Sequence, residues 1–143
     1  MKPLRDFKEF VQNEIIKTQT PDKLRADDIT RESERKENFL NTILNKIGLN
    51  QENAKDIIEY CYDIIIGLIR AKMLLNGFNS SGAGAHEAEV SYLKELNFDE
   101  AGIQFMNQLR YFRNGIKYYG RRFDVEYAQK VLSFSKKMKR KLK

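Results

Sequence analysis

The sequence is poor in cysteine, proline, histidine and tryptophan, and each scarcity excludes a class of protein. Of the 143 residues one is Cys, two are Pro, one is His and none is Trp. A single cysteine cannot form an intramolecular disulfide, so a disulfide-stapled fold is excluded and a reducing compartment is expected. One histidine and one cysteine are too few for a structural zinc site. So little proline also excludes collagen and proline-rich linkers.

Long hydrophobic runs are missing as well. The longest strongly apolar run, Ile64–Ile69, is bounded by Asp63 and Arg70, whereas a membrane span needs about 20 residues. The first residues carry charge from Lys2 onward and lack the apolar stretch of a signal peptide. We therefore expect a soluble, cytoplasmic protein that does not contact a membrane.

The composition is that of one globular domain with an uneven charge. Hydrophobic residues make up 41% of the chain, which at this length is enough for one core. The net charge of +6 divides into −4 over residues 1–109 and +10 over residues 110–143. Such a concentration of positive charge predicts an anionic partner for the C-terminal part.

Apolar residues recur at helical spacing almost throughout, which predicts an all-α fold. The helix expected over about 50–76 is apolar on most sides and should be the central one. Residues 30–38 include no apolar side chain and are predicted as a solvated helix turn or a mobile loop, and residues 78–84 as an adaptable Gly-Ser loop. We expect a bundle of four core helices over 49–135, preceded by a helical extension over 1–48 and followed by a basic tail over 136–143.

The helix expected over about 100–119 separates into two faces. One face is apolar and belongs to the core. The other is basic and polar and continues past the helix, and its members are Arg110, Arg113, Asn114, Lys117, Arg121 and Arg122. Like charges at this spacing repel, and neighbouring tyrosines could stack on bases, so the face predicts a nucleic-acid-binding surface. The alternative is a solvated face, or one paired with acids elsewhere in the fold.

The stretch Leu109–Gly120 resembles the signature helix of HEPN domains, which are small all-α bundles from prokaryotes. Their hallmark is an Arg, usually followed by a polar residue, and then a His four to six positions after the Arg. The preceding helices agree with the resemblance: Tyr60–Asp63, the apolar run after it, a Gly-aromatic turn and then Ala85–Glu87. The likeness covers about residues 50–135.

The resemblance implies a four-helix HEPN bundle that is usually dimeric, with the motif faces meeting at a cleft. In active members the Arg and His cut RNA without a metal, and many members act with a nucleotidyltransferase as a toxin–antitoxin pair. Arg113 and Asn114 match the first two motif positions, whereas the His position falls on Tyr118. A tyrosine with a pKa of about 10 is a poor general base at neutral pH but can donate a hydrogen bond to phosphate.

Three further residues are candidates for supporting the cleft. His86, the sole histidine, is either a partly exposed residue in the first turn of a helix or is brought by the Gly-Ser loop to Arg113. Glu59 and Asp63 lie four residues apart and so share a helix face. Asp63 either forms a structural ion pair with one of the arginines at 70, 110 and 113, or orients Arg113 in the cleft.

The function expected from these features is binding of RNA or a nucleotide by a HEPN-like homodimer. Such a protein would act beside a nucleotidyltransferase as a toxin–antitoxin or defence component, with no metal or other cofactor. The alternative is a non-catalytic helical dimer whose basic face docks an acidic protein partner. The tail from Lys136 is either a solvated helix end or an arm that binds RNA or a partner.

Overall fold

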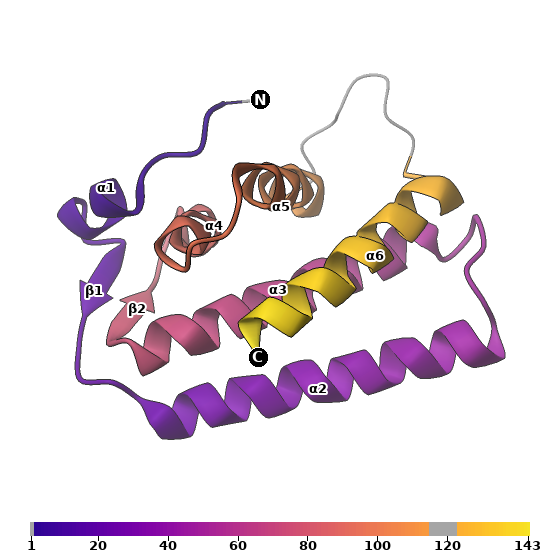
Figure 1. Ribbon diagram of the computed structural model, residues 1–143, viewed down its shortest axis with the longest axis horizontal. Coiled ribbons are helices and arrows are strands. Elements are labelled where there is room, and N and C mark those ends of the chain that lie inside the picture. Colours follow the sequence, from indigo (N-terminus) through magenta and orange to yellow (C-terminus); the bar gives the residue numbers. More distant parts are fainter. Residues whose placement is uncertain (1, 115–122) are drawn as a thin grey trace.

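Helices dominate the computed structural model, which describes residues 2–114 and 123–143. Within these residues lie six helices and two short strands, in the order α1 (Phe7–Gln12), β1 (Ile16–Thr18), α2 (Lys23–Lys46), α3 (Ala54–Leu75), β2 (Phe78–Ser80), α4 (Ala85–Glu95), α5 (Glu100–Arg113) and α6 (Val125–Leu142) (Figure 1). The all-α class predicted from the sequence is confirmed. No helix of the described residues combines the length and hydropathy needed to cross a membrane.

α3 is the central helix, as its apolar composition predicted. It contacts α2, α4, α5 and α6, with α2 along one side and α4 and α5 on the other (Figure 1). Its side chains are buried around most of the helix, including Cys61 at 0% exposure. Burial raises the pKa of the Cys61 thiol to about 11, so the side chain stays an uncharged, small hydrophobic group.

α2 is one continuous helix, and a loop over residues 30–38 is not present. The helix passes Ser33, which is 4% exposed and whose Oγ donates to the carbonyl of Ile64 at 3.4 Å. A Cβ atom at Gly67 would lie 2.5 Å from Ser33 Oγ, so the glycine allows α2 and α3 to approach closely. The sequence pattern missed this contact because small and polar side chains make it.

Two strands join the N-terminal segment to the turn after α3, where the sequence predicted only helices and loops. β1 and β2 pair antiparallel, with Ile16 opposite Ser80. The amide of Gln19 also donates to the carbonyl of Gly77 at 2.8 Å. Gly77 has a φ of +82°, and a Cβ there would lie 2.7 Å from the Gln19 carbonyl oxygen. Strands of three residues are too short to show a recognisable alternation in the sequence.

α6 continues to Leu142, so the basic residues after 135 are its last turns. Met138 and Leu142 are both buried at 3% exposure. Lys139 Nζ lies 2.9 Å from Glu37 Oε1 on α2, and Lys143 reaches the other carboxylate oxygen. Burial raises the pKa of Glu37, but the two lysines outweigh it and hold that pKa below its usual value. This end of α6 is therefore packed and paired.

Candidate functional site

A polar cavity of about 270 Å³ opens where the beginning of α4 meets the end of α5. We call it the α4–α5 cavity, and it is lined by Gly82, Gly84, Ala85, His86, Glu87, Arg110 and Asn114. Three residues singled out from the sequence, His86, Arg110 and Asn114, therefore share one cavity. The Gly-rich connection does bring His86 to the motif helix, although its neighbours in the cavity are Arg110 and Asn114.

The beginning of α4 presents backbone amides at the α4–α5 cavity. Gly84, with a φ of +89°, caps the helix without a side-chain hydrogen bond. The amide of Ala85 donates to the Gly82 carbonyl, but within the described residues the amides of His86 and Glu87 have no acceptor. Free amides at a helix N-terminus favour an anion through both hydrogen bonds and the helix dipole.

Arg110 is buried, and the exposed position predicted for it on the basic face is wrong. Arg110 is only 9% exposed to solvent. Its Nε donates to Asn107 Oδ1 at 3.0 Å, and its guanidinium lies 4.6 Å from the centroid of the Tyr111 ring. Among the described side chains no carboxylate lies within ion-pair distance of it. The helical pattern gave the correct face but not the depth, because the start of α4 covers this part of α5. A buried cation next to a polar cavity is suited to binding an anion.

Arg113 lies at the surface and is paired with Asp63. Its Nε donates to Asp63 Oδ1 at 3.3 Å, and the two side chains are 42% and 34% exposed. Of the three arginines considered as ion-pair partners of Asp63, Arg113 is therefore the one that pairs with it, while Arg70 pairs with Glu89. An exposed pair of this kind contributes about 0–1 kcal/mol, so it mainly orients the arginine. Asn114 follows directly as the exposed C-cap of α5.

Glu59 lies one turn before Asp63 on α3. It is half-buried and makes no ion pair within the described part of the chain. The structure therefore places Asp63, but not Glu59, in contact with the motif arginine.

The ring of His86 contacts the hydroxyl group of a buried tyrosine. Its Nδ1 lies 3.4 Å from the hydroxyl oxygen of Tyr62, which is 0% exposed. Burial, with a smaller effect of Glu89, raises the pKa of Tyr62 well above its usual value, so the hydroxyl keeps its proton. The Tyr62 hydroxyl and the His86 ring therefore share one hydrogen bond, whose donor depends on the tautomer of His86. The sequence did not single out Tyr62 as a site residue.

The N-terminal segment contributes to the same region, which the sequence did not predict. Arg5 Nη2 lies 3.0 Å from Glu87 Oε1, and the Arg5 backbone and Nε donate to the other carboxylate oxygen. Burial raises the pKa of Glu87, but the hydrogen bonds from Arg5, together with the nearby charge of Arg110, outweigh it and hold that pKa below its usual value. The backbone amide of Lys2 donates to the Tyr111 hydroxyl at 3.2 Å. No local pattern relates residues more than 80 positions apart.

Four predicted residues, Lys117, Tyr118, Arg121 and Arg122, lie outside the described residues. Their roles stay sequence predictions. Among the residues that the structure describes, no three His, Cys, Asp or Glu side chains gather in a way that could hold a metal ion.

Comparison of the chain with protein-family models, with curated proteins and with solved structures found no match. The geometry of the α4–α5 cavity is therefore the basis for assigning a function.

Proposed function

We propose that this chain binds RNA or a nucleotide and holds a phosphate group in the α4–α5 cavity. The observation that carries the proposal is Arg110, whose guanidinium is buried beside the cavity with no described carboxylate within ion-pair distance. The Glu87 carboxylate, which also lines the cavity and interacts with the charge of Arg110, is hydrogen-bonded to Arg5. A phosphate would supply the missing negative charge, and a guanidinium matches its oxygens with paired donors. The volume of about 270 Å³ is below the roughly 300–1,000 Å³ of drug-sized ligand pockets, which suits a phosphate group.

The donors that line the cavity have roles that follow from their positions, and the one lining acid, Glu87, is paired with Arg5. The amides at the start of α4 add hydrogen bonds to the phosphate that Arg110 holds. His86, through a ring N–H, and Asn114, through its side-chain amide, supply further donors. Arg113, oriented by Asp63 at the surface, contacts the next phosphate along a strand.

The proposal includes a relationship to HEPN domains and a four-helix bundle of the HEPN kind. The all-α fold, the central α3 and the Arg113–Asn114 pair at the end of α5 support this relationship. On this proposal the chain acts as a homodimer beside a nucleotidyltransferase, in a toxin–antitoxin or defence pair. The proposed activity is binding, since the motif position of the catalytic histidine is a tyrosine.

The test is RNA binding by variants of the two arginines. Fluorescence anisotropy would compare labelled single-stranded RNA, structured RNA and a labelled nucleotide in buffer with a metal chelator. We expect Arg110→Gln to weaken binding by at least about tenfold, a loss of about 1.4 kcal/mol. Arg113→Ala should weaken RNA binding and reduce its salt dependence.

A matched control is Arg140→Gln, which removes the same charge from an exposed position on α6. Its affinity should equal that of the unmodified protein. Binding that survives Arg110→Gln unchanged, or that is absent from the unmodified protein, contradicts the proposal. Electrophoresis of the same mixtures reads cleavage, and cleavage dependent on Arg113 would add ribonuclease activity to binding.

A further inference from the structure

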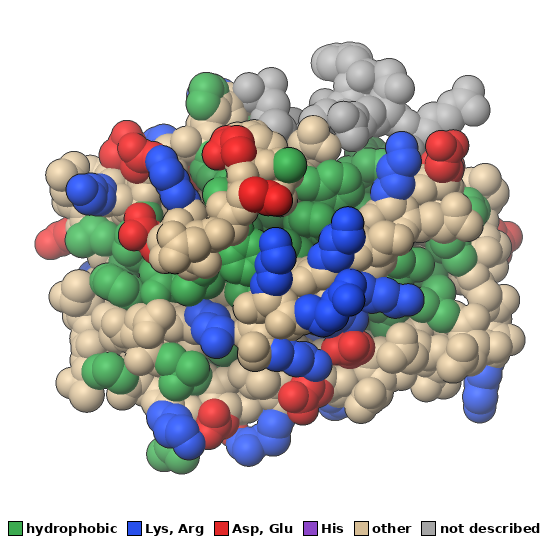
Figure 2. All heavy atoms as spheres, viewed as in Figure 1, with side chains coloured by type: hydrophobic (Ala, Val, Ile, Leu, Met, Phe, Trp, Pro, Cys, Tyr) green, Lys and Arg blue, Asp and Glu red, His purple; other side chains and the backbone are tan. Residues whose placement is uncertain are grey.

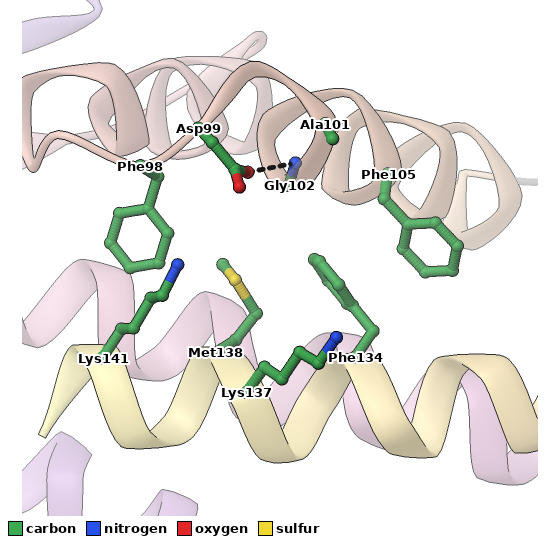
Figure 3. A pocket seen from close by; sticks show the side chains of 9 residues that line it. All are labelled: Phe98, Asp99, Ala101, Gly102, Phe105, Phe134, Lys137, Met138 and Lys141. Atoms are coloured by element: carbon green, nitrogen blue, oxygen red, sulfur yellow. Dashed lines mark hydrogen bonds between the residues drawn. The ribbon is translucent and has the colours of Figure 1, made fainter.

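A second concavity, distinct from the α4–α5 cavity, lies between the first half of α5 and the second half of α6. Its volume is about 230 Å³. We call it the α5–α6 hollow. Figure 3 shows that aromatic rings and one thioether line it, with two ammonium groups and one carboxylate beside them: Phe98, Phe105, Phe134, Met138, Lys137, Lys141 and Asp99.

The lining of the α5–α6 hollow is apolar but incompletely covered. Phe98, Phe105 and Phe134 are all only half-buried, and the rings of Phe105 and Phe134 pack with their centroids 4.5 Å apart. Met138 projects from α6 toward α5 between the two lysines (Figure 3). The hollow is smaller than the roughly 300–1,000 Å³ of small-molecule pockets and matches a single inserted apolar side chain.

The rim of the hollow carries a net positive charge, because two lysines accompany one lining acid, Asp99, whose Oδ1 accepts from the Gly102 amide at 2.8 Å. Lys137 and Lys141, one turn apart on α6, make no ion pair within the described residues, and Lys141 Nζ lies 5.4 Å from the Phe98 ring centroid. By contrast, Lys139 and Lys143 both pair with Glu37. Lysine and arginine side chains also gather over α6 in Figure 2. Like charges one turn apart repel, so this side of α6 is complementary to an acidic partner.

We infer that the α5–α6 hollow docks an acidic segment of a partner protein that inserts one large apolar side chain. The inserted side chain lies between Phe98 and Phe134, and carboxylates on either side of it contact Lys137 and Lys141. An apolar anchor surrounded by charged contacts is the usual energetic arrangement of a small protein interface.

Two other occupants fit this surface less well. Single-stranded nucleic acid needs open ring faces for stacking, but Lys141 lies over Phe98, and Phe105 packs against Phe134 and Tyr127. A second copy of the chain in a two-fold contact would bring the lysines of both copies together. An acidic peptide meets neither obstacle.

The experiment selects peptides from a random displayed library on the full-length protein. We expect enriched peptides to combine Asp or Glu with one large apolar residue. A labelled copy of an enriched peptide should lose affinity by at least about tenfold for the double variant Lys137→Glu, Lys141→Glu. The matched control is Lys136→Glu, Arg140→Glu, which makes the same charge change on exposed residues of α6 that do not line the hollow. Its affinity should fall much less.

Two further measurements locate the peptide. Its addition should shift the NMR signal of the Met138 methyl group, which lines the hollow, and leave that of the buried Met106 unchanged. The variant Arg110→Gln should bind the peptide normally, because the hollow is independent of the α4–α5 cavity. Failure of the proposed RNA binding therefore leaves this inference standing, and the reverse also holds.

The inference is overturned if the library yields no enriched peptide, or only peptides without acidic residues. Equal binding by Lys137→Glu, Lys141→Glu also overturns it. Labelled oligouridine that shifts the Met138 signal in place of the peptide would assign the hollow to nucleic acid. Self-association abolished by the same double variant would assign it to a second copy, and either result replaces an acidic partner.

Discussion

Two arginines lie next to α4, Arg70 on α3 and Arg110 on α5, and their surroundings differ in one respect. Arg70 donates through Nε and Nη2 to both carboxylate oxygens of Glu89, at 2.5 and 3.1 Å, and Ser80 Oγ donates to the same carboxylate at 2.9 Å. Arg110 is more deeply buried than the 33% exposed side chain of Arg70, yet its described hydrogen bond goes to the neutral amide of Asn107.

The proposed function gives the two arginines different roles, one in stabilising the fold and one in binding a ligand. Around Arg70 the charges are matched, so the cluster joins α3, α4 and β2 without attracting anything from outside. Around Arg110 no described carboxylate lies within ion-pair distance. The Glu87 carboxylate, whose pKa Arg110 helps to lower, lines the same polar cavity but is hydrogen-bonded to Arg5. On the proposed function, a bound phosphate offsets the cost of burying the Arg110 cation.

The largest expected effect on stability comes from removing the counter-charge of Arg70. Glu89 is 0% exposed, so Glu89→Gln leaves Arg70 without its counter-charge and should lower the free energy of unfolding by about 3 kcal/mol. Urea denaturation followed by circular dichroism measures this loss. The matched control, Glu95→Gln, changes an exposed acid on the same helix and should leave stability almost unchanged. A loss for Glu89→Gln no larger than that of the control would contradict a structural role.

A smaller effect on stability is expected when Arg110 is replaced. Arg110→Met removes a buried charge but leaves Asn107 Oδ1 without its donor, and the two effects oppose each other. The free energy of unfolding should change by about 1 kcal/mol or less, while phosphate binding is lost. Denaturation and RNA binding measured on the same variant test this separation. A stability loss as large as that of Glu89→Gln would make Arg110 a structural residue.

The smallest effect on stability is expected for the partly exposed ion pair of Arg5 and Glu87. Because the hydrogen bonds of Arg5 lower the pKa of Glu87 in the folded protein, the pair stabilises the fold above the ordinary glutamate pKa. That contribution is lost as the pH falls through the folded pKa. The unfolding free energies of the unmodified protein and Glu87→Gln should therefore differ at about pH 7 and converge as the pH falls below the lowered pKa of Glu87. A constant difference over this range would show that the pair is not responsible.

Regular helical spacing made part of this structure predictable from the sequence. It identified α3 as the central helix and Cys61 as a buried side chain, since both depend on apolar residues repeating along one element. The middle of α2 was missed because it packs through Ser33 against Gly67, where no apolar repeat exists. The pairing of β1 with β2 was missed because it joins segments far apart in the chain.

The sequence indicated some residues of the candidate site but not their depth. The motif helix indicated Arg110, Arg113 and Asn114, and His86 was named as the histidine that the loop could bring to it. The burial of Arg110 and the pairing of Arg113 with Asp63 depend on how α3 and α4 cover α5. The contact of Arg5 with Glu87 depends on the path of the N-terminal segment. Burial and long-range pairing are determined by tertiary packing, which cannot be predicted from the spacing of residues along one helix.

The pairing of Ile16 with Ser80 also has a consequence for the order of folding. It closes a loop of about sixty residues that contains all of α2 and α3, and closing so long a loop early is entropically unfavourable. We expect the α2–α3 hairpin to form first and the N-terminal segment to dock afterwards. Arg5 then reaches Glu87 only in the last stage, so the wall of the α4–α5 cavity is completed after the core that supports it.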